Sequence, residues 1–201
     1  MSIGNGIKRH IEIQDEVRKT HVDLHKTARW SFLGEHPAII DQYGKDVFKV
    51  SDRIMEHFKV PFTAVKFCGS SQTGFSFIKK TDFDPQKSDL DVAIIDTSIF
   101  LKIKEEIYTI TKGYSDLSCF PITLYSCRHP YNAFVHNLKM GFINPYCLPN
   151  CDLKNDIDTF SNTLTTNFRK TFKSITFVFY ETEYFFICKQ EAALRRAQEV
   201  V

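Results

Sequence analysis

A short segment of alternating acidic and apolar residues, followed by an apolar run, constrains the fold more than any other feature of the chain. Asp89 and Asp91 flank Leu90, and the uninterrupted apolar run 92–95 follows directly. An apolar run of this length is typical of a strand that is buried on both faces in an α/β protein. Because side chains alternate along a strand, Asp89 and Asp91 should share one face of it.

Elements predicted on either side place this strand in an α/β fold. The 3–4 spacing of apolar residues predicts helices, and runs of Phe, Thr, Val and Ile predict strands. The predicted helices are 45–58, 99–110 and 130–139, and the predicted strands are 62–68, 89–96 and 119–126. The stretch 71–88 contains Gly74 and Pro85 and is interpreted as a loop. We expect a short, mixed, twisted sheet with helices packed on one main face.

The C-terminal segment contains neither Gly nor Pro from Asp152 to the end. Apolar residues recur at helical spacing from Phe160 to Leu194, which predicts one long helix with at most one break near 181–184. The residues of 175–187 favour a strand instead, but the unbroken period favours the helix. We therefore expect a domain over 1–150, with N-terminal helices, and a helical segment over 151–201 that packs on it. This helix is also a candidate surface for homo-oligomer formation.

Composition excludes several classes of protein. With 43% apolar and 25% charged residues, the chain has the composition of a folded protein rather than a disordered one. A net charge of +2 argues against sequence-blind nucleic-acid binding through a strongly basic surface. The start of the chain is polar, and no apolar run approaches the ~18 residues of a membrane span. Together with six cysteines that form no disulfide pattern, this predicts a cytoplasmic protein with free thiols and no membrane partner.

A second motif precedes the acidic segment. Gly69 and Ser70 stand at the end of a predicted strand, and Gly74 follows shortly after. A Gly at that place lets a polyphosphate approach the backbone, where amide N–H groups and the Ser70 hydroxyl can donate to it. Two carboxylates on one face repel each other unless a cation neutralises them, and Mg²⁺ prefers carboxylate and phosphate oxygens. Together these segments predict a metal-dependent site for a nucleoside triphosphate.

These residues resemble the motif of the DNA polymerase β-like nucleotidyltransferase superfamily. That motif joins a Gly-Ser at a strand end, a second Gly, and an acidic-apolar-acidic triplet on the next strand. The matching residues are Gly69, Ser70, Thr73, Gly74, Ser88, Asp89, Leu90 and Asp91. The resemblance covers roughly 46–126, and the Gly-Ser-x-x-Thr-Gly form is most similar to the minimal and cGAS/DncV-like branches.

The resemblance implies an activity. A nucleoside monophosphate would pass from an NTP, most simply ATP, to a hydroxyl acceptor, with Mg²⁺ or Mn²⁺ and release of pyrophosphate. Asp89 and Asp91 would bind the metal, and Gly69 and Ser70 would hold the β- and γ-phosphates. Thr73, Gly74 and Ser88 would shape the pocket. The acceptor stays open among a protein, a nucleic acid, a small molecule and a second nucleotide.

Two departures from the family pattern bear on activity. The spacing from Gly74 to Asp89 is long, and its lysines, such as Lys79, either are solvated or contact the triphosphate. The family's third carboxylate, a general base and metal ligand, should lie on the predicted strand 119–126, which has no acid. The candidates are Asp116, just before that strand, and Glu181 or Glu183 if 175–187 is a strand. Without a third acid, the chain would be a catalytically silent nucleotide-binding or interaction module of a regulatory, antitoxin-like or defence-associated kind.

Overall fold

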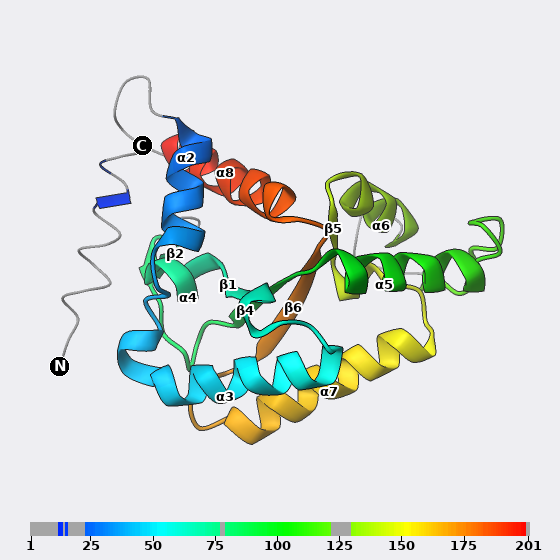
Figure 1. Cartoon of the computed structure of the whole chain (residues 1–201), viewed down its shortest axis with the longest axis horizontal. Helices are drawn as coiled ribbons and strands as arrows, with labels where there is room; N and C mark the ends of the chain where they lie inside the picture. The colour runs from blue at the N-terminus through cyan, green and yellow to red at the C-terminus, as the bar shows by residue number, and fades with distance from the viewer. Residues whose placement is uncertain (1–11, 14, 16–22, 77–78, 122–129, 200–201) are drawn as a thin grey trace.

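The structure is a computed structural model of the 201-residue chain, and it describes residues 12–13, 15, 23–76, 79–121 and 130–199. It has an α/β fold with a four-stranded sheet in the order β1-β4-β6-β5 and a second, two-stranded sheet, β2-β3 (Figure 1). The strands are β1 (Val65–Phe67), β2 (Phe75–Ser76), β3 (Thr81–Asp82), β4 (Leu90–Ile95), β5 (Phe142–Ile143) and β6 (Ile175–Tyr180). The helices are α2 (Leu24–Arg29), α3 (Ile40–Phe58), α4 (Gly69–Thr73), α5 (Thr97–Ile110), α6 (Pro130–Lys139), α7 (Asp152–Phe168) and α8 (Glu183–Glu199). Short π- and 3₁₀-helices are η1 (Trp30–Gly34), η2 (Phe62–Ala64) and η3 (Pro145–Cys147).

The large sheet is mixed, as the sequence predicts. The central strands β4 and β6 are parallel, with Asp91 opposite Thr176 and Ile95 opposite Tyr180. The outer strands β1 and β5 are antiparallel to their neighbours. The predicted strand 89–96 and helices 99–110 and 130–139 are confirmed as β4, α5 and α6.

Helices cover both faces of the sheet, so the expectation of one main helical face is wrong. Leu90 and Phe177 belong to a core that includes buried side chains of α3, α5 and α7. Ala93 and Tyr180 face the other way and pack in a second core with residues of α2 and α8. Figure 1 shows α2 and α8 on one side of the strands and α3 and α7 on the other. Asp91 on β4, and Asp89 just before it, therefore lie at the start of a strand that is covered on both faces.

The long C-terminal helix predicted for 152–201 is replaced by α7, β6 and α8. The Phe series conceals two periods, because Phe160, Leu164 and Phe168 recur at helical spacing in α7, whereas Phe177 and Phe179 alternate in β6. The six residues of β6 are all β-branched or aromatic, and pairing with β4 decides in favour of the strand. The large sheet thus combines strands from both predicted units, 1–150 and 151–201.

Two other predictions need correction or lie outside the described residues. The stretch 71–88 is not one loop, because it contains most of α4 and the β2-β3 hairpin. In the predicted strand 119–126, residues 119–121 do not form a strand, and the rest lies outside the described residues. Among the described residues, no helix combines the length and the apolar character needed to cross a membrane.

Candidate functional site

The two predicted motifs meet where β1 turns into α4. Gly69 adopts a left-handed backbone conformation with φ of +60°, and a Cβ on it would lie 2.9 Å from Oδ2 of Asp91. The backbone also joins the two segments, since the Cys68 N–H donates to the Asp91 carbonyl at 3.1 Å. Only Gly combines this φ with so close an approach to the carboxylate. The predicted phosphate cradle and the predicted metal ligand are therefore in direct contact.

Each carboxylate of the acid pair is held by a hydroxyl at the N-terminal end of β6. Ser174, just before the strand, donates to Oδ1 of Asp89, and Thr176 donates to Oδ1 of Asp91 at 2.9 Å. The ammonium of Lys173 lies 3.4 Å from Oδ1 of Asp89. These contacts fix one oxygen of each carboxylate and orient the side chains toward the same end of the sheet.

The protein shifts the pKa values of the two acids in opposite directions. Burial raises the pKa of Asp91; the hydrogen bond from Thr176 opposes this rise, and the charge of Asp89 adds to it. The hydrogen bond from Ser174 lowers the pKa of Asp89, despite a smaller opposing effect of burial, and Lys173 lowers it further. Lys79 favours the ionised form of both. The pair thus resists carrying two negative charges, and a bound cation would relieve that repulsion.

The remaining predicted cradle residues have different environments. Ser70 is half-buried beside Gly69. Thr73 is buried, and its hydroxyl lies 2.8 Å from the Phe75 carbonyl, to which it can donate, so it stabilises the turn. Gly74, with φ of +79°, follows the last residue of α4, and its backbone N–H donates to the Ser70 carbonyl at 2.8 Å. Ser88 donates its backbone N–H to Asp84 at 2.7 Å and precedes the acid pair. Gly69, with Ser70 next to it, is therefore the part of the predicted cradle that approaches the Asp91 carboxylate in space.

The structure does not bring the predicted third acids to this site. Asp116 follows α5, whose far end points away from the sheet in Figure 1, and its carboxylate is 3.1 Å from Lys112. Glu181 follows the C-terminal end of β6, five residues beyond Thr176, which is about 16 Å along a strand. Glu183 begins α8, still further on. At the start of β6, the side chains beside the acid pair are the hydroxyls of Ser174, just before the strand, and Thr176.

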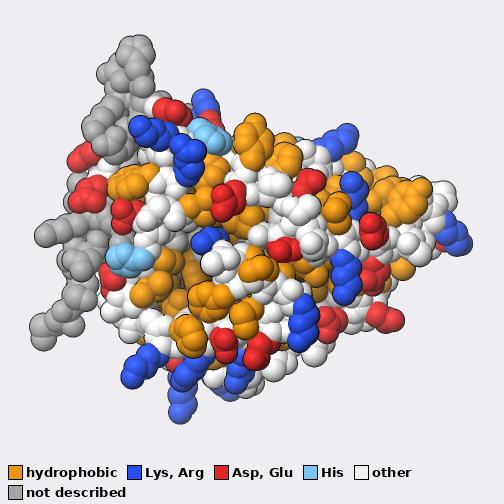
Figure 2. All heavy atoms as spheres, viewed as in Figure 1, with side chains coloured by type: hydrophobic (Ala, Val, Ile, Leu, Met, Phe, Trp, Pro, Cys, Tyr) orange, Lys and Arg blue, Asp and Glu red, His pale blue; other side chains and the backbone are white. Residues whose placement is uncertain are grey.

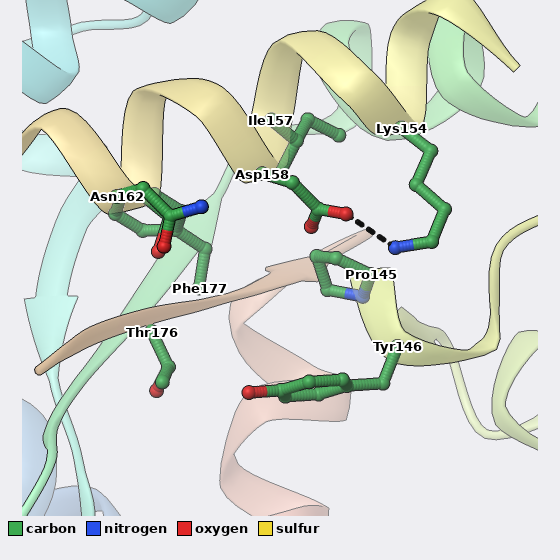
Figure 3. Close-up of a pocket in the computed structure, with 9 residues that line it drawn as sticks. Pro145, Tyr146, Lys154, Ile157, Asp158, Asn162, Thr176 and Phe177 are labelled. Atoms are coloured by element: carbon green, nitrogen blue, oxygen red, sulfur yellow. Dashed lines mark hydrogen bonds and ion pairs between the residues drawn. The ribbon is translucent and has the colours of Figure 1, made fainter. Parts of the chain in front are cut away.

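A pocket of about 240 Å³ lies at the other edge of β6 (Figure 3). It is lined by Pro145, Tyr146, Lys154, Ile157, Asp158, Ser161, Asn162, Thr176 and Phe177. Thr176 both lines this pocket and donates a hydrogen bond to Asp91 of the acid pair. Sequence reasoning missed both Asp158 and Tyr146. The spacing of Lys154 and Asp158 indicates only an ion pair on a helix surface.

A larger cavity of about 520 Å³ lies away from the carboxylates, between η1, α3 and β1. Its lining is mainly apolar and includes Phe48 and Phe62, whose rings are 5.6 Å apart. Figure 2 shows hydrophobic side chains gathered over α3 on this face of the molecule. The cavity contains neither acid of the pair, so it is not part of this site.

The acid pair fits Mg²⁺ only as part of a larger ligand set. Among the described residues, no group of three or more His, Cys, Asp and Glu side chains is placed to hold a metal ion. Mg²⁺ commonly takes one or two carboxylates and completes its shell with phosphate oxygens and water. Asp89 and Asp91 supply the two carboxylates, so the donor set suits a metal that arrives with a polyphosphate.

Comparisons of the chain with protein-family models, with curated proteins and with solved structures gave no match. A nucleotidyltransferase assignment therefore depends on the motif and on the geometry of this site.

Proposed function

We propose that the chain binds a nucleoside triphosphate with Mg²⁺ or Mn²⁺ and acts as a nucleotidyltransferase toward a hydroxyl acceptor. The observation that carries the proposal is the contact between Gly69 and Asp91, two residues that are distant in sequence and adjacent in the fold. A phosphate that approaches the Gly69 backbone would lie beside the carboxylates that can share its metal. ATP is the nucleotide to test first.

Each residue has a distinct role in this proposal. Gly69 and Ser70 hold the β- and γ-phosphates through backbone N–H groups and a hydroxyl. Asp89 and Asp91 hold the metal, which neutralises charge on the phosphates and on the displaced oxygen. Ser174 and Thr176 keep the carboxylates oriented, and Lys79, whose charge acts on both acids, lies close enough to favour an anionic ligand.

A second candidate is binding of the nucleotide without transfer. The observation in its favour is that the groups beside the acids at the start of β6 are the hydroxyls of Ser174 and Thr176 rather than a carboxylate. In the family that the motif resembles, a later strand supplies a third carboxylate there. General-base assistance contributes about 10²–10⁴-fold to such reactions, so its loss would leave binding intact and slow the chemistry.

Calorimetric titration with ATP, with and without Mg²⁺, tests the proposal. Wild type should bind ATP in a Mg²⁺-dependent manner, and Asp89→Asn combined with Asp91→Asn should abolish that binding. Asp41→Asn, which removes an exposed acid paired with His36, is the matched control and should bind normally. Equal ATP affinity in the double variant and wild type would contradict the site. Pyrophosphate release then separates transfer from silent binding.

A further inference from the structure

We infer that the pocket beyond β6 is the acceptor pocket of this site and takes a small hydroxylated ring of the size of one sugar. This inference rests on the function proposed above and adds the place and class of the second substrate. It follows from the order of groups across the sheet, the shape of the β6 edge and the geometry of phosphoryl displacement.

The groups of the site follow one another across the sheet. Gly69 follows β1, Asp91 lies on β4, and Thr176 lies on β6, in the strand order β1-β4-β6. Thr176 contacts Asp91 on one side and lines the pocket on the other. A ligand in the pocket would therefore lie on the side of the acid pair opposite to the phosphate cradle.

The pocket exists because β5 stops pairing with β6. The β5–β6 register sets Ile143 opposite Phe179, and continuing it sets Pro145 opposite Phe177. Pro145 has no amide hydrogen to donate, and the chain turns into η3 at that residue. Closer to the start of β6, the backbone of Ile175 forms hydrogen bonds with α7. The Ser161 hydroxyl donates to the Ile175 carbonyl, and the Ile175 N–H donates to the Thr165 hydroxyl.

The backbone of Phe177 faces this gap. Ser174 accepts a hydrogen bond from Leu90 of β4, whereas the N–H and C=O of Ile175 point away from β4, toward α7. Because these groups alternate along a strand, those of Phe177 also point away from β4. Phe177 thus offers one main-chain donor and one acceptor to a ligand in the pocket.

Displacement at phosphorus places the acceptor on this side. The attacking and leaving oxygens lie roughly in line across the phosphorus that is transferred. Pyrophosphate leaves on the side of Gly69 and Ser70, where the β- and γ-phosphates bind. The attacking hydroxyl must then enter from the opposite side, where Thr176 and the pocket lie.

The lining of the pocket points to a sugar-like ring. Tyr146 is 76% exposed, and Figure 3 shows its ring beside Thr176, with the phenolic oxygen directed toward that residue. The Tyr146 and Pro145 side chains offer an apolar surface to the C–H face of a ring. Lys154, Asp158 and Asn162 supply donors and acceptors for several hydroxyls. A volume of about 240 Å³ suits one ring rather than a polymer.

The transfer step balances with groups that are present in the pocket. The acceptor oxygen forms a bond to the α-phosphorus, and the bond from that phosphorus to the bridging oxygen of the β-phosphate breaks. Pyrophosphate leaves with the electron pair. The hydroxyl proton passes to Asp158, the carboxylate that lines the pocket, whose other oxygen is held by Lys154.

Ligand-observed NMR on the full chain tests the pocket. The probes are glucose, galactose, mannose and glucosamine, each at millimolar concentration with Mg²⁺ and a non-hydrolysable ATP analogue. At least one sugar should receive saturation from wild-type protein. Tyr146→Ala should remove that signal, whereas Tyr184→Ala, which removes an exposed tyrosine on α8, should keep it. Absence of binding by all four sugars, or a signal unchanged in Tyr146→Ala, would overturn the inference.

Pyrophosphate release with ATP tests the role as acceptor pocket. The sugar that binds should stimulate release, and Asp158→Asn should lower the rate at least tenfold with ATP affinity unchanged. Asp156→Asn, on the same helix and paired with His57, should keep the rate. Sugar binding without stimulated release would overturn the acceptor assignment. Failure of the proposed function has a separate signature, which is loss of Mg²⁺-dependent ATP binding by wild type itself.

Discussion

Replacement of Gly69 by Ala separates the two reasons for which the structure needs Gly at this position. The first reason is the backbone, because φ of +60° is strained for any residue with a Cβ. The second is the carboxylate, because the new Cβ would lie 2.9 Å from Oδ2 of Asp91. Asp91 must rotate away, and its hydrogen bond from Thr176 is then weakened or lost.

The magnitudes of the two effects follow from these contacts. A left-handed conformation costs about 1–2 kcal/mol for a residue other than Gly. A hydrogen bond to a charged group contributes about 1.5–3 kcal/mol. If both effects apply in full, the unfolding free energy should therefore fall by roughly 2.5–5 kcal/mol. If Asp91 is displaced from the metal position, ATP affinity should fall by about 10- to 100-fold, since each 1.4 kcal/mol is tenfold.

Urea denaturation and calorimetric titration with Mg²⁺ and ATP measure these effects separately. Gly113→Ala is the matched control, because Gly113 has φ of +69° and its Cβ would lie nearest to the side chain of Tyr108, away from the acid pair. Both variants should lose stability, and only Gly69→Ala should lose ATP affinity. If Gly69→Ala binds ATP as tightly as wild type, the contact with Asp91 has no part in nucleotide binding.

Three further predictions concern Asp91, Thr176 and Phe179. The pKa of Asp91 is raised in the folded state, so the folded state binds more protons than the unfolded state between the ordinary and the raised pKa, and stability falls as pH rises through that window. Asp91→Asn should therefore raise Tm at pH 7 while it abolishes ATP binding. A Tm below that of wild type would contradict this. Thr176→Asp should place a third carboxylate opposite Asp91. The Tm of this variant should rise when Mn²⁺ is added without nucleotide, a response that wild type lacks. A Tm that is insensitive to Mn²⁺ would refute this prediction. Phe179→Ala, at a fully buried position of β6, should lower the unfolding free energy measured by urea denaturation by about 3–5 kcal/mol. The control Phe48→Ala, at an exposed position, should lower it by about 0.5 kcal/mol. Similar losses in the two variants would show that β6 is not part of the core.

Local patterns were sufficient to predict the elements that carry the acid pair. The apolar run 92–95 predicts β4 because a strand buried on both faces must be apolar on both. The Gly-Ser segment is predicted to stand at the end of a strand, and Gly69 begins α4 just after β1. These features depend on neighbours close in sequence, so the sequence alone can predict them.

The strand β6 could not be predicted in the same way. Its side chains fit a helix by spacing and a strand by residue type, and only pairing with β4 decides between them. The hydroxyls of Ser174 and Thr176 become part of the site through that pairing, about 85 residues away in sequence. The pocket with Asp158 depends on it as well. The sequence therefore predicts the acids and the cradle but not the groups that orient them.

The pairing of β6 with β4 also determines how the site can bind a metal. Ser174, Thr176 and Lys173 engage Oδ1 of the two acids, and the nearby Lys79 offsets more of their charge. An isolated cation would meet only two carboxylates whose charge is already partly neutralised by lysines. A triphosphate supplies both further oxygen ligands and the negative charge that the lysines can balance. Mg²⁺ and nucleotide should therefore bind together, each raising the affinity for the other by the same factor, because coupling between two binding sites is reciprocal.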